Sequence, residues 1–281
     1  MNRLFQRSVA FCIFFCMTPI YPYLNKKETP TVKYLQPIDV TETHSGFPGI
    51  DCIYVINLDQ HPQKWELLKT TFSEFNLSPN RVPAINGWEM TTLQKQELFG
   101  PYPIQLRGGQ IGCMLSHISI LNDAYKRGFK KIWILEDDVI FTENPECLID
   151  PLTKLEELAP DWDIFYTDTN LTKLDGSYLL HPPELRLRPK QRINRRRIRA
   201  QNQPISSDIL TSTLRFGLHS YLVSEQGIKK ILEYFTHTHL WSPIDWDIHV
   251  IPGIKEYKYA RDLTLQNRTI SNTTVPPDPI E

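Results

Sequence analysis

Short apolar runs alternate along the chain with segments whose apolar residues recur every three or four positions. The runs at 52–58 and 131–135 are nearly continuous and β-rich, which is typical of strands buried on both faces of a sheet. The spacing from Trp65 to Phe75 and over 110–126 predicts amphipathic helices. Gly128 is expected to end the second helix in a left-handed conformation.

Shorter segments complete the predicted architecture. Residues 81–86 are expected to form an edge strand, because Pro83 has no N–H to donate to a ladder. Residues 88–107 are predicted to be mostly a surface excursion. The other predicted elements are a helix over 152–158, strands over 162–167 and 216–224, and a helix over 225–235 that Ser224 caps. This order predicts an α/β protein with a mostly parallel central sheet flanked by helices.

The ends of the chain differ from its centre. Residues 1–24 carry a basic flank and then about a dozen mostly apolar residues, which resembles a signal peptide or a short signal anchor and predicts membrane association. Residues 25–48 are polar and contain prolines, which is typical of a linker or stem. The predicted catalytic domain covers 49–265, and 266–281 form a polar tail.

Composition excludes several classes of protein. The 31 basic and 32 acidic residues nearly cancel, so charge gives no basis for a nucleic-acid partner and none is expected. The 5 cysteines are odd in number and widely spaced, which indicates neither a disulfide scaffold nor a zinc ribbon. The glycine-rich motifs of phosphate-loop and Rossmann nucleotide sites are absent from the sequence.

Three adjacent acids follow the apolar run at 131–135: Glu136, Asp137 and Asp138. The carboxyl edge of a parallel sheet is where ligands bind in open α/β folds. Adjacent carboxylates repel one another, and a hard divalent cation such as Mn²⁺ or Mg²⁺ would offset that repulsion with oxygen ligands. The alternative is an acidic turn that caps the next element.

Two other groups of residues each leave two interpretations open. Cys113 and His117 lie four residues apart on the predicted helix and could share a face as metal ligands. No second pair completes such a site, so the alternative is that both are packed or hydrogen-bonded side chains. Asp168 ends the strand at 162–167 either as a functional acid or as a cap.

The segment 241–248 combines aromatic rings with two acids. If it is extended, Asp245 and Asp247 point the same way, because side chains alternate along a strand. An acid beside aromatic rings suits a general base flanked by sugar-stacking surfaces, and a helix-capping acid is the alternative. Separately, 186–199 carry eight basic residues and no acid, which indicates a solvated loop or a loop that binds an anion such as phosphate.

Taken together, these segments resemble glycosyltransferase family 25, the family of lipooligosaccharide and lipopolysaccharide β-galactosyltransferases and of collagen galactosyltransferases. The motifs that carry the resemblance occur in family order: YVINLD (54–59), RVPAING (81–87), GQIGCMLSHISIL (109–121), ILEDDV (134–139), GLHSYLVSEQGIKKIL (217–232) and SPIDWDI (242–248).

The resemblance implies a GT-A-like fold that binds a nucleotide sugar. It also implies inverting transfer of a hexose, typically galactose from UDP-galactose, with UDP-glucose as the other donor considered. The acidic triplet then takes the place of the metal-binding DxD motif and holds Mn²⁺ on the diphosphate. Because His219 is expected on a strand near the acids, it is a candidate third metal ligand, with a structural histidine as the alternative. The donor-binding positions that lie in the matched motifs are Asn57, Asp59, Asn86, Gly87, Ser116, His117 and Glu136, and Lys64, outside the motifs, is a further predicted donor contact.

Asp245 is the preferred general base, with Asp247 and Asp168 behind it. One departure is that the family tends to have arginines after the first strand, where this chain has 59–64, DQHPQK; Lys64 or the 186–199 run is the expected substitute. The expected acceptor is a hydroxyl of a glycan such as lipooligosaccharide. The alternatives are a collagen-type hydroxylysine galactosyltransferase and a noncatalytic carbohydrate-binding or assembly protein on a decayed transferase fold.

Overall fold

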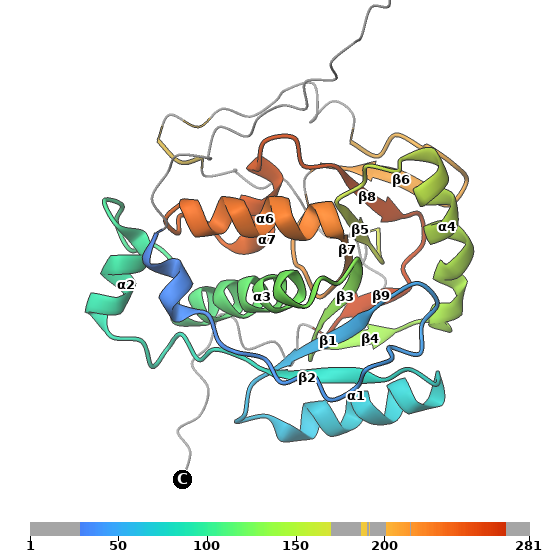
Figure 1. Cartoon of the computed structure of the whole chain (residues 1–281), viewed down its shortest axis with the longest axis horizontal. Coiled ribbons are helices and arrows are strands. Elements are labelled where there is room, and N and C mark those ends of the chain that lie inside the picture. The colour runs from blue at the N-terminus through green and yellow to red at the C-terminus, as the bar shows by residue number, and fades with distance from the viewer. Residues whose placement is uncertain (1–28, 170–186, 190, 192–200, 214, 268–281) are drawn as a thin grey trace, which may run out of the picture.

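The computed structural model describes residues 29–169, 187–189, 191, 201–213 and 215–267 (Figure 1). In these residues a seven-stranded sheet has the order β2-β1-β3-β7-β5-β8-β6. Its strands are β1 (Cys52–Asn57), β2 (Pro79–Pro83), β3 (Lys131–Glu136), β5 (Ile164–Tyr166), β6 (Ile209–Ser212), β7 (Ser220–Ser224) and β8 (Glu256–Tyr259).

The sheet is mostly parallel, as predicted. β1 pairs in parallel with β2 and β3, and β5 pairs in parallel with β8. β7 is antiparallel to both β3 and β5, so β3 and β5 share one direction; β6 is antiparallel to β8. Among the described strands of this sheet, β6 and β7 therefore oppose the other five.

Helices cover both faces of the sheet (Figure 1). The longer helices are α1 (Pro62–Glu74), α2 (Thr92–Phe99), α3 (Gly108–Arg127), α4 (Ile149–Leu158) and α6 (Glu225–His237). The short ones are α7 (Ile244–Asp247) and the 3₁₀ turns η1 (Pro30–Tyr34), η2 (Pro145–Leu148) and η3 (Ile248–Val250). A second, two-stranded antiparallel sheet pairs β4 (Val139–Phe141) with β9 (Thr264–Gln266).

Alternate residues of the central strands enter two separate cores. Tyr54 and Ile134 pack in the core formed with α3 and α6, whereas Val55 and Trp133 pack in the core formed with α1 and α4. All four are fully buried. This two-sided burial is why the strands are apolar along their whole length, and it confirms the strands predicted at 52–58 and 131–135.

Several predicted helix ends are confirmed. Gly128 follows α3 with a φ of 72°, and Ser224 accepts a hydrogen bond from Gly227 N at the start of α6. The predicted strand at 81–86 lies at the sheet edge but begins earlier, at Pro79, and ends at Pro83.

Two segments form helices that the sequence analysis did not predict. The segment 88–107 is mostly at the surface, as predicted, but it contains α2, which a Thr91–Gln94 capping box starts and whose Leu98 and Phe99 are buried. The segment considered as extended at 241–248 forms α7 and η3 instead. Its Ile244 and Ile248 lie four residues apart and are both buried, so a helical turn serves the core where alternation would not.

The described part of the predicted linker lies against the domain. Thr29 N donates to Thr236 O in α6 at 2.8 Å, and Tyr34 Oη donates to Glu97 in α2 at 2.6 Å. Gln36 N donates to Ser119 Oγ in α3 at 2.9 Å. The described helices include none that combines the length and the apolar character needed to cross a bilayer. The predicted signal-like segment 1–24 lies outside the described residues.

Candidate active site

The site lies where the carboxyl ends of β1 and β3 meet the start of β7. Ile56 and Glu136 are register partners at the ends of β1 and β3. Because β7 is antiparallel to β3, the residues that precede it lie at this same edge, and Glu136 N donates to His219 O at 2.9 Å. The topology therefore gathers three sequence-predicted regions at one sheet edge, as expected for an open α/β fold.

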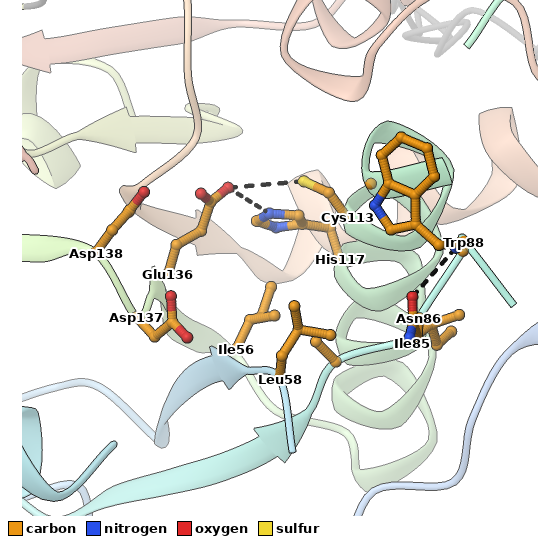
Figure 2. A pocket seen from close by; sticks show the side chains of 13 residues that line it. Ile56, Leu58, Ile85, Asn86, Trp88, Cys113, His117, Glu136, Asp137 and Asp138 are labelled. Atoms are coloured by element: carbon orange, nitrogen blue, oxygen red, sulfur yellow. Dashed lines mark hydrogen bonds and ion pairs between the residues drawn. The ribbon is translucent and has the colours of Figure 1, made fainter. Parts of the chain in front are cut away.

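A pocket opens at this edge (Figure 2). Its walls come from the end of β1, the loop after β2, α3 and the acidic turn after β3. The lining residues are Ile56, Leu58, Ala84, Ile85, Asn86, Gly87, Trp88, Gly109, Cys113, His117, Glu136, Asp137 and Asp138. The predicted positions Asn86, Gly87, His117 and Glu136 thus share one cavity with the other two acids.

Glycines hold the loop after β2 tightly against α3. A Cβ on Gly87 would meet Gly108 O at 2.2 Å, and a Cβ on Gly112 would meet Ile85 O at 2.1 Å. Real Cβ atoms do not approach backbone this closely, so these positions exclude larger residues. The close contact brings Asn86 and Trp88 over the first turns of α3, where they form one wall of the pocket.

Glu136 faces α3. In Figure 2 it lies between Asp138 and the side chains of Cys113 and His117. Its Oε1 is 3.2 Å from His117 Nε2 and 3.7 Å from Cys113 Sγ, and His117 Nδ1 is 2.9 Å from Tyr221 Oη. Burial favours the neutral acid, but the His117 hydrogen bond and the nearby imidazoles outweigh it and lower the pKa of Glu136.

Cys113, His117 and Glu136 bring their ligand atoms within 4.8 Å of one another, a grouping that can hold a metal ion. The contacts of Cys113 and His117 with Glu136 fit the hydrogen-bonded interpretation, and Glu136 is also the further ligand that the metal interpretation lacked in the sequence. Burial, and then the charges of Glu136 and Asp245, raise the pKa of the Cys113 thiol well above its ordinary value, so it is a neutral thiol in this arrangement.

Asp137 is held by two predicted donor-site residues. Asn57 Nδ2 donates to its Oδ2 at 2.8 Å, and Lys64 Nζ lies 3.4 Å from its Oδ1. Burial raises the pKa of Asp137, and the Lys64 charge and the Asn57 hydrogen bond partly offset that rise. Arg81, which the sequence interpretation passed over, fixes Asn57 from the neighbouring strand through Nε to Oδ1 at 2.8 Å.

Asp138 is the least satisfied of the three acids. Its side chain is 3% exposed, Gln266 Nε2 donates to Oδ2 at 3.1 Å, and Oδ1 is buried without a hydrogen-bond partner among the described residues. Burial, together with the charges of Glu136 and Asp137, raises the pKa of Asp138 to about 8. A buried carboxylate oxygen without a donor, beside two further acids, fits the ligand set of a hard divalent cation.

Asp245 approaches the pocket from α7. Gly217 N donates to its Oδ2 at 2.8 Å. Burial is the main cause that raises the pKa of Asp245 to about 6, and the charge of Glu136 adds to it. Its charge in turn acts on Cys113, which lines the pocket. A carboxylate with this pKa is mostly ionised at neutral pH yet basic enough to accept a proton.

Asp168 and His219 form a buried group with an arginine that the sequence interpretation did not single out. Arg215 Nη2 lies 2.7 Å from Asp168 Oδ1, and its guanidinium stacks 4.0 Å from the Tyr166 ring centroid. His219 Nε2 is 3.8 Å from the same Asp168 oxygen. His219 and Arg215 thus share the Asp168 carboxylate in a buried network, and His219 is also near enough for its charge to act on Glu136.

Three predicted site residues have contacts that point away from the pocket. Asp247 forms a buried two-pronged ion pair with Arg188, with Nη2 to Oδ2 at 2.5 Å, because α7 is helical and turns it away from Asp245. Asp59 is 71% exposed and pairs with Arg81 at 2.6 Å. Ser116 is buried, and its Oγ accepts from Ile85 N at 2.8 Å, so it anchors the loop after β2 and does not line the cavity.

The predicted substitutes for the missing arginines have different outcomes. Lys64 reaches the site through Asp137. The 186–199 run lies mostly outside the described residues, and Arg188, its described arginine, is committed to Asp247. Sequence signals for the other site residues were weak, because Gln266 and Arg215 reach the site only through strand pairing and burial.

Comparisons with known proteins place the chain in a family. Residues 50–248 match the family model described as "Glycosyltransferase family 25 (LPS biosynthesis protein)". Similar proteins include human "Procollagen galactosyltransferase 2", 22% identical over 255 residues, which covers 84% of this chain and 37% of that protein. Human "Inactive glycosyltransferase 25 family member 3" is 30% identical over 128 residues, covering 42% of this chain and 22% of that protein. The chain therefore spans well under half the length of these relatives.

Two solved structures share parts of the fold at low similarity. One is described as "Crystal Structure of A197 from STIV", with a TM-score of 0.34 and 8% identity over 74% of this chain and 80% of that one. The other is a glycosyltransferase involved in glycosylation of the PBCV-1 major capsid, with a TM-score of 0.34 and 11% identity over 74% of this chain and 81% of that one.

Proposed function

Because the chain belongs to glycosyltransferase family 25, we propose that it moves a hexose from a UDP-sugar to a hydroxyl of a glycan acceptor, with inversion at the anomeric carbon. UDP-galactose is the proposed donor and UDP-glucose its alternative. The observation that carries the proposal is the acidic turn at the sheet edge, where the pocket meets a buried Asp138 oxygen that has no hydrogen-bond partner among the described residues.

The pocket has apolar and acidic lining residues, and the proposed donor site uses both. Trp88 gives an apolar surface that suits a flat base ring and lies away from the acids in Figure 2, while Ile56 and Leu58 line the pocket beside the acidic turn. Glu136, Asp137 and Asp138 would hold Mn²⁺ or Mg²⁺ there. When bound, such a cation stabilises the negative charge that develops on the departing diphosphate. Lys64, next to Asp137, adds a fixed positive charge on the same side.

Asp245 is the proposed general base. It accepts the proton of the acceptor hydroxyl while the hydroxyl oxygen forms a bond to the anomeric carbon and the bond from that carbon to the phosphate oxygen breaks. UDP leaves from the opposite face, which inverts the centre. The hydrogen bond from Gly217 N fixes the Asp245 carboxylate for this step.

The acceptor class is proposed from the family. The matched family is described as an LPS biosynthesis family, which favours a lipooligosaccharide or lipopolysaccharide glycan. Similarity to procollagen galactosyltransferase 2 over 84% of the chain makes collagen hydroxylysine the second candidate. We also propose that residues 1–24 associate the protein with a membrane, where a lipid-linked acceptor would be met.

Calorimetric titration of the full chain with UDP, UDP-galactose and UDP-glucose, each with Mn²⁺ and with a chelator, tests the proposal. We expect one UDP-sugar to bind with Mn²⁺ and to lose at least tenfold in affinity with chelator. With Mn²⁺ present, Asp138→Asn should bind the donor as weakly as the wild type does with chelator, and Asp123→Asn, near the other end of α3, serves as the matched control.

A noncatalytic protein on the same fold is the second candidate, because one similar human protein is named inactive. The two candidates differ in release of UDP from the donor. A folded wild-type chain that binds no UDP-sugar and releases no UDP with any acceptor would refute the transferase proposal and favour a carbohydrate-binding role.

A further inference from the structure

A second pocket lies beside the first, between the start of α3 and the segment that leads into α7. It is lined by Gln105, Leu106, Gln110, Trp241, Ser242, Pro243 and Trp246. The two pockets adjoin through consecutive residues, because Gly109 lines the first and Gln110 the second. The described residues that form the second pocket take no part in the donor site proposed above.

Asp245 connects the two pockets. It lies between Pro243 and Trp246, which line the second pocket, and its charge acts on Cys113 and Glu136, which line the first. A group held in the second pocket would therefore be adjacent to the proposed base while the donor occupies the first. An acceptor hydroxyl must lie beside the base that takes its proton, and a group in the second pocket meets that requirement.

The lining selects a chemical class of ligand. Two indoles, a proline and a leucine give apolar surfaces, while two amides and a hydroxyl supply hydrogen-bonding groups. Among the described residues that line this pocket, none carries a formal charge. This combination suits a neutral pyranose, which has an apolar face for an aromatic ring and hydroxyls at its rim. A hydroxylysine side chain is a cation and would find no paired charge in the lining.

The aromatic rings are held in fixed orientations. Trp241 packs edge to face on Tyr102 with centroids 5.1 Å apart, and Trp246 packs similarly on Phe216 at 5.4 Å. Gln105 Nε2 donates to Trp241 O at 2.6 Å, and Gln110 Oε1 accepts from Arg107 N at 2.9 Å. The walls of the pocket are thus set by contacts within the protein, so a ligand meets preorganised surfaces.

We propose that this second pocket is the acceptor subsite and that it receives a neutral sugar ring at the end of the acceptor glycan. This assignment rests on the proposed transferase function, because only a transferase has an acceptor. Trp246 and Trp241 supply the stacking surfaces, and Asp245 lies next to the hydroxyl that attacks.

Direct binding of free saccharides to the full chain tests the subsite without turnover. Saturation-transfer NMR with glucose, galactose, N-acetylglucosamine and lactose should find one that binds the wild type. Trp246→Ala, and independently Trp241→Ala, should weaken that binding about tenfold, the loss of one well-placed aromatic contact. Tyr125→Ala, an exposed aromatic at the other end of α3, is the matched control. With a UDP-sugar donor, the tryptophan variants should raise the acceptor KM more than they lower kcat.

The outcomes separate the two proposals. If a UDP-sugar binds but both tryptophan variants keep wild-type saccharide affinity, the subsite is refuted and the transferase function stands. If binding of a hydroxylysine peptide, rather than of a saccharide, depends on Trp246, the neutral-sugar assignment is refuted. If no UDP-sugar binds while saccharide binding depends on Trp246, the transferase function fails and the pocket stands as a saccharide site.

Discussion

Asp245→Asn is the sharpest test of the proposed chemistry. Asparagine has the same shape and keeps an oxygen to accept from Gly217 N, so the change removes the base with little disturbance of the fold. Positioned general bases typically contribute about 10²- to 10⁴-fold to rate. We therefore expect kcat to fall by at least about 100-fold, with donor affinity within about threefold of wild type.

The pH dependence follows from the pKa of Asp245, which burial raises to about 6. The ionised form is the base, so wild-type kcat should fall as pH drops through about 6 and level off above about 7. The same raised pKa means that folding desolvates a charged carboxylate at pH 7, a cost that disappears as pH falls. Asp245→Asn should accordingly stabilise the fold at pH 7, by about 3 kcal/mol at most.

Two assays check these expectations. A coupled UDP-release assay at saturating donor and acceptor gives kcat across pH 5 to 8, where the low-pH limb should be present in the wild type. Urea unfolding gives the stability of both proteins. An Asp245→Asn protein with ordinary kcat, or a wild-type profile that is flat through pH 6, would show that another group removes the proton.

The remaining predictions concern residues that shape the site. Asp247→Asn leaves Arg188 buried without its partner and should cost about 3–5 kcal/mol in urea unfolding, with any loss of kcat following the folded fraction; a stable, inactive variant would contradict this structural role. Gly87→Ala places a Cβ 2.2 Å from Gly108 O, so it should lower the free energy of unfolding by about 1–3 kcal/mol and weaken donor binding. Unchanged donor affinity in calorimetry would mean that the loop after β2 does not contact the donor. Ser116→Ala removes the acceptor for Ile85 N and should cost about 1–3 kcal/mol, measured by the same unfolding.

The central sheet and the acidic edge could be predicted because the local signals there are strong. The run at 131–135 is apolar on both faces because both faces are covered, and the acids begin where that cover ends. The end of α3 was predictable from Gly128, whose positive φ suits a residue without a Cβ. These features depend on neighbours in the sequence, so a single chain reveals them.

Pairing between distant residues could not be predicted in this way. Arg188 is buried against Asp247, although the many positive charges of its segment predict a solvated loop. Arg215 is buried against Asp168, and its own segment gives no sign of this pairing. Gln266 is the first residue of the predicted polar tail, yet it reaches Asp138 because β9 pairs with β4. The four-residue spacing of Ile244 and Ile248 indicates the helical turn, whereas the two-residue spacing of the acids suggested a strand.

That helical turn decides how the two neighbouring acids divide their roles. An extended segment would present Asp245 and Asp247 on one face, and the two carboxylates would compete for the same proton. In α7 they diverge: Asp247 pairs with the Arg188 guanidinium, while Asp245 keeps a raised pKa and accepts from the Gly217 backbone N–H next to both pockets. The buried ion pair on one side of α7 thus holds the helix that presents the proposed base on the other. Stability and chemistry are therefore separable by substitution at positions two residues apart.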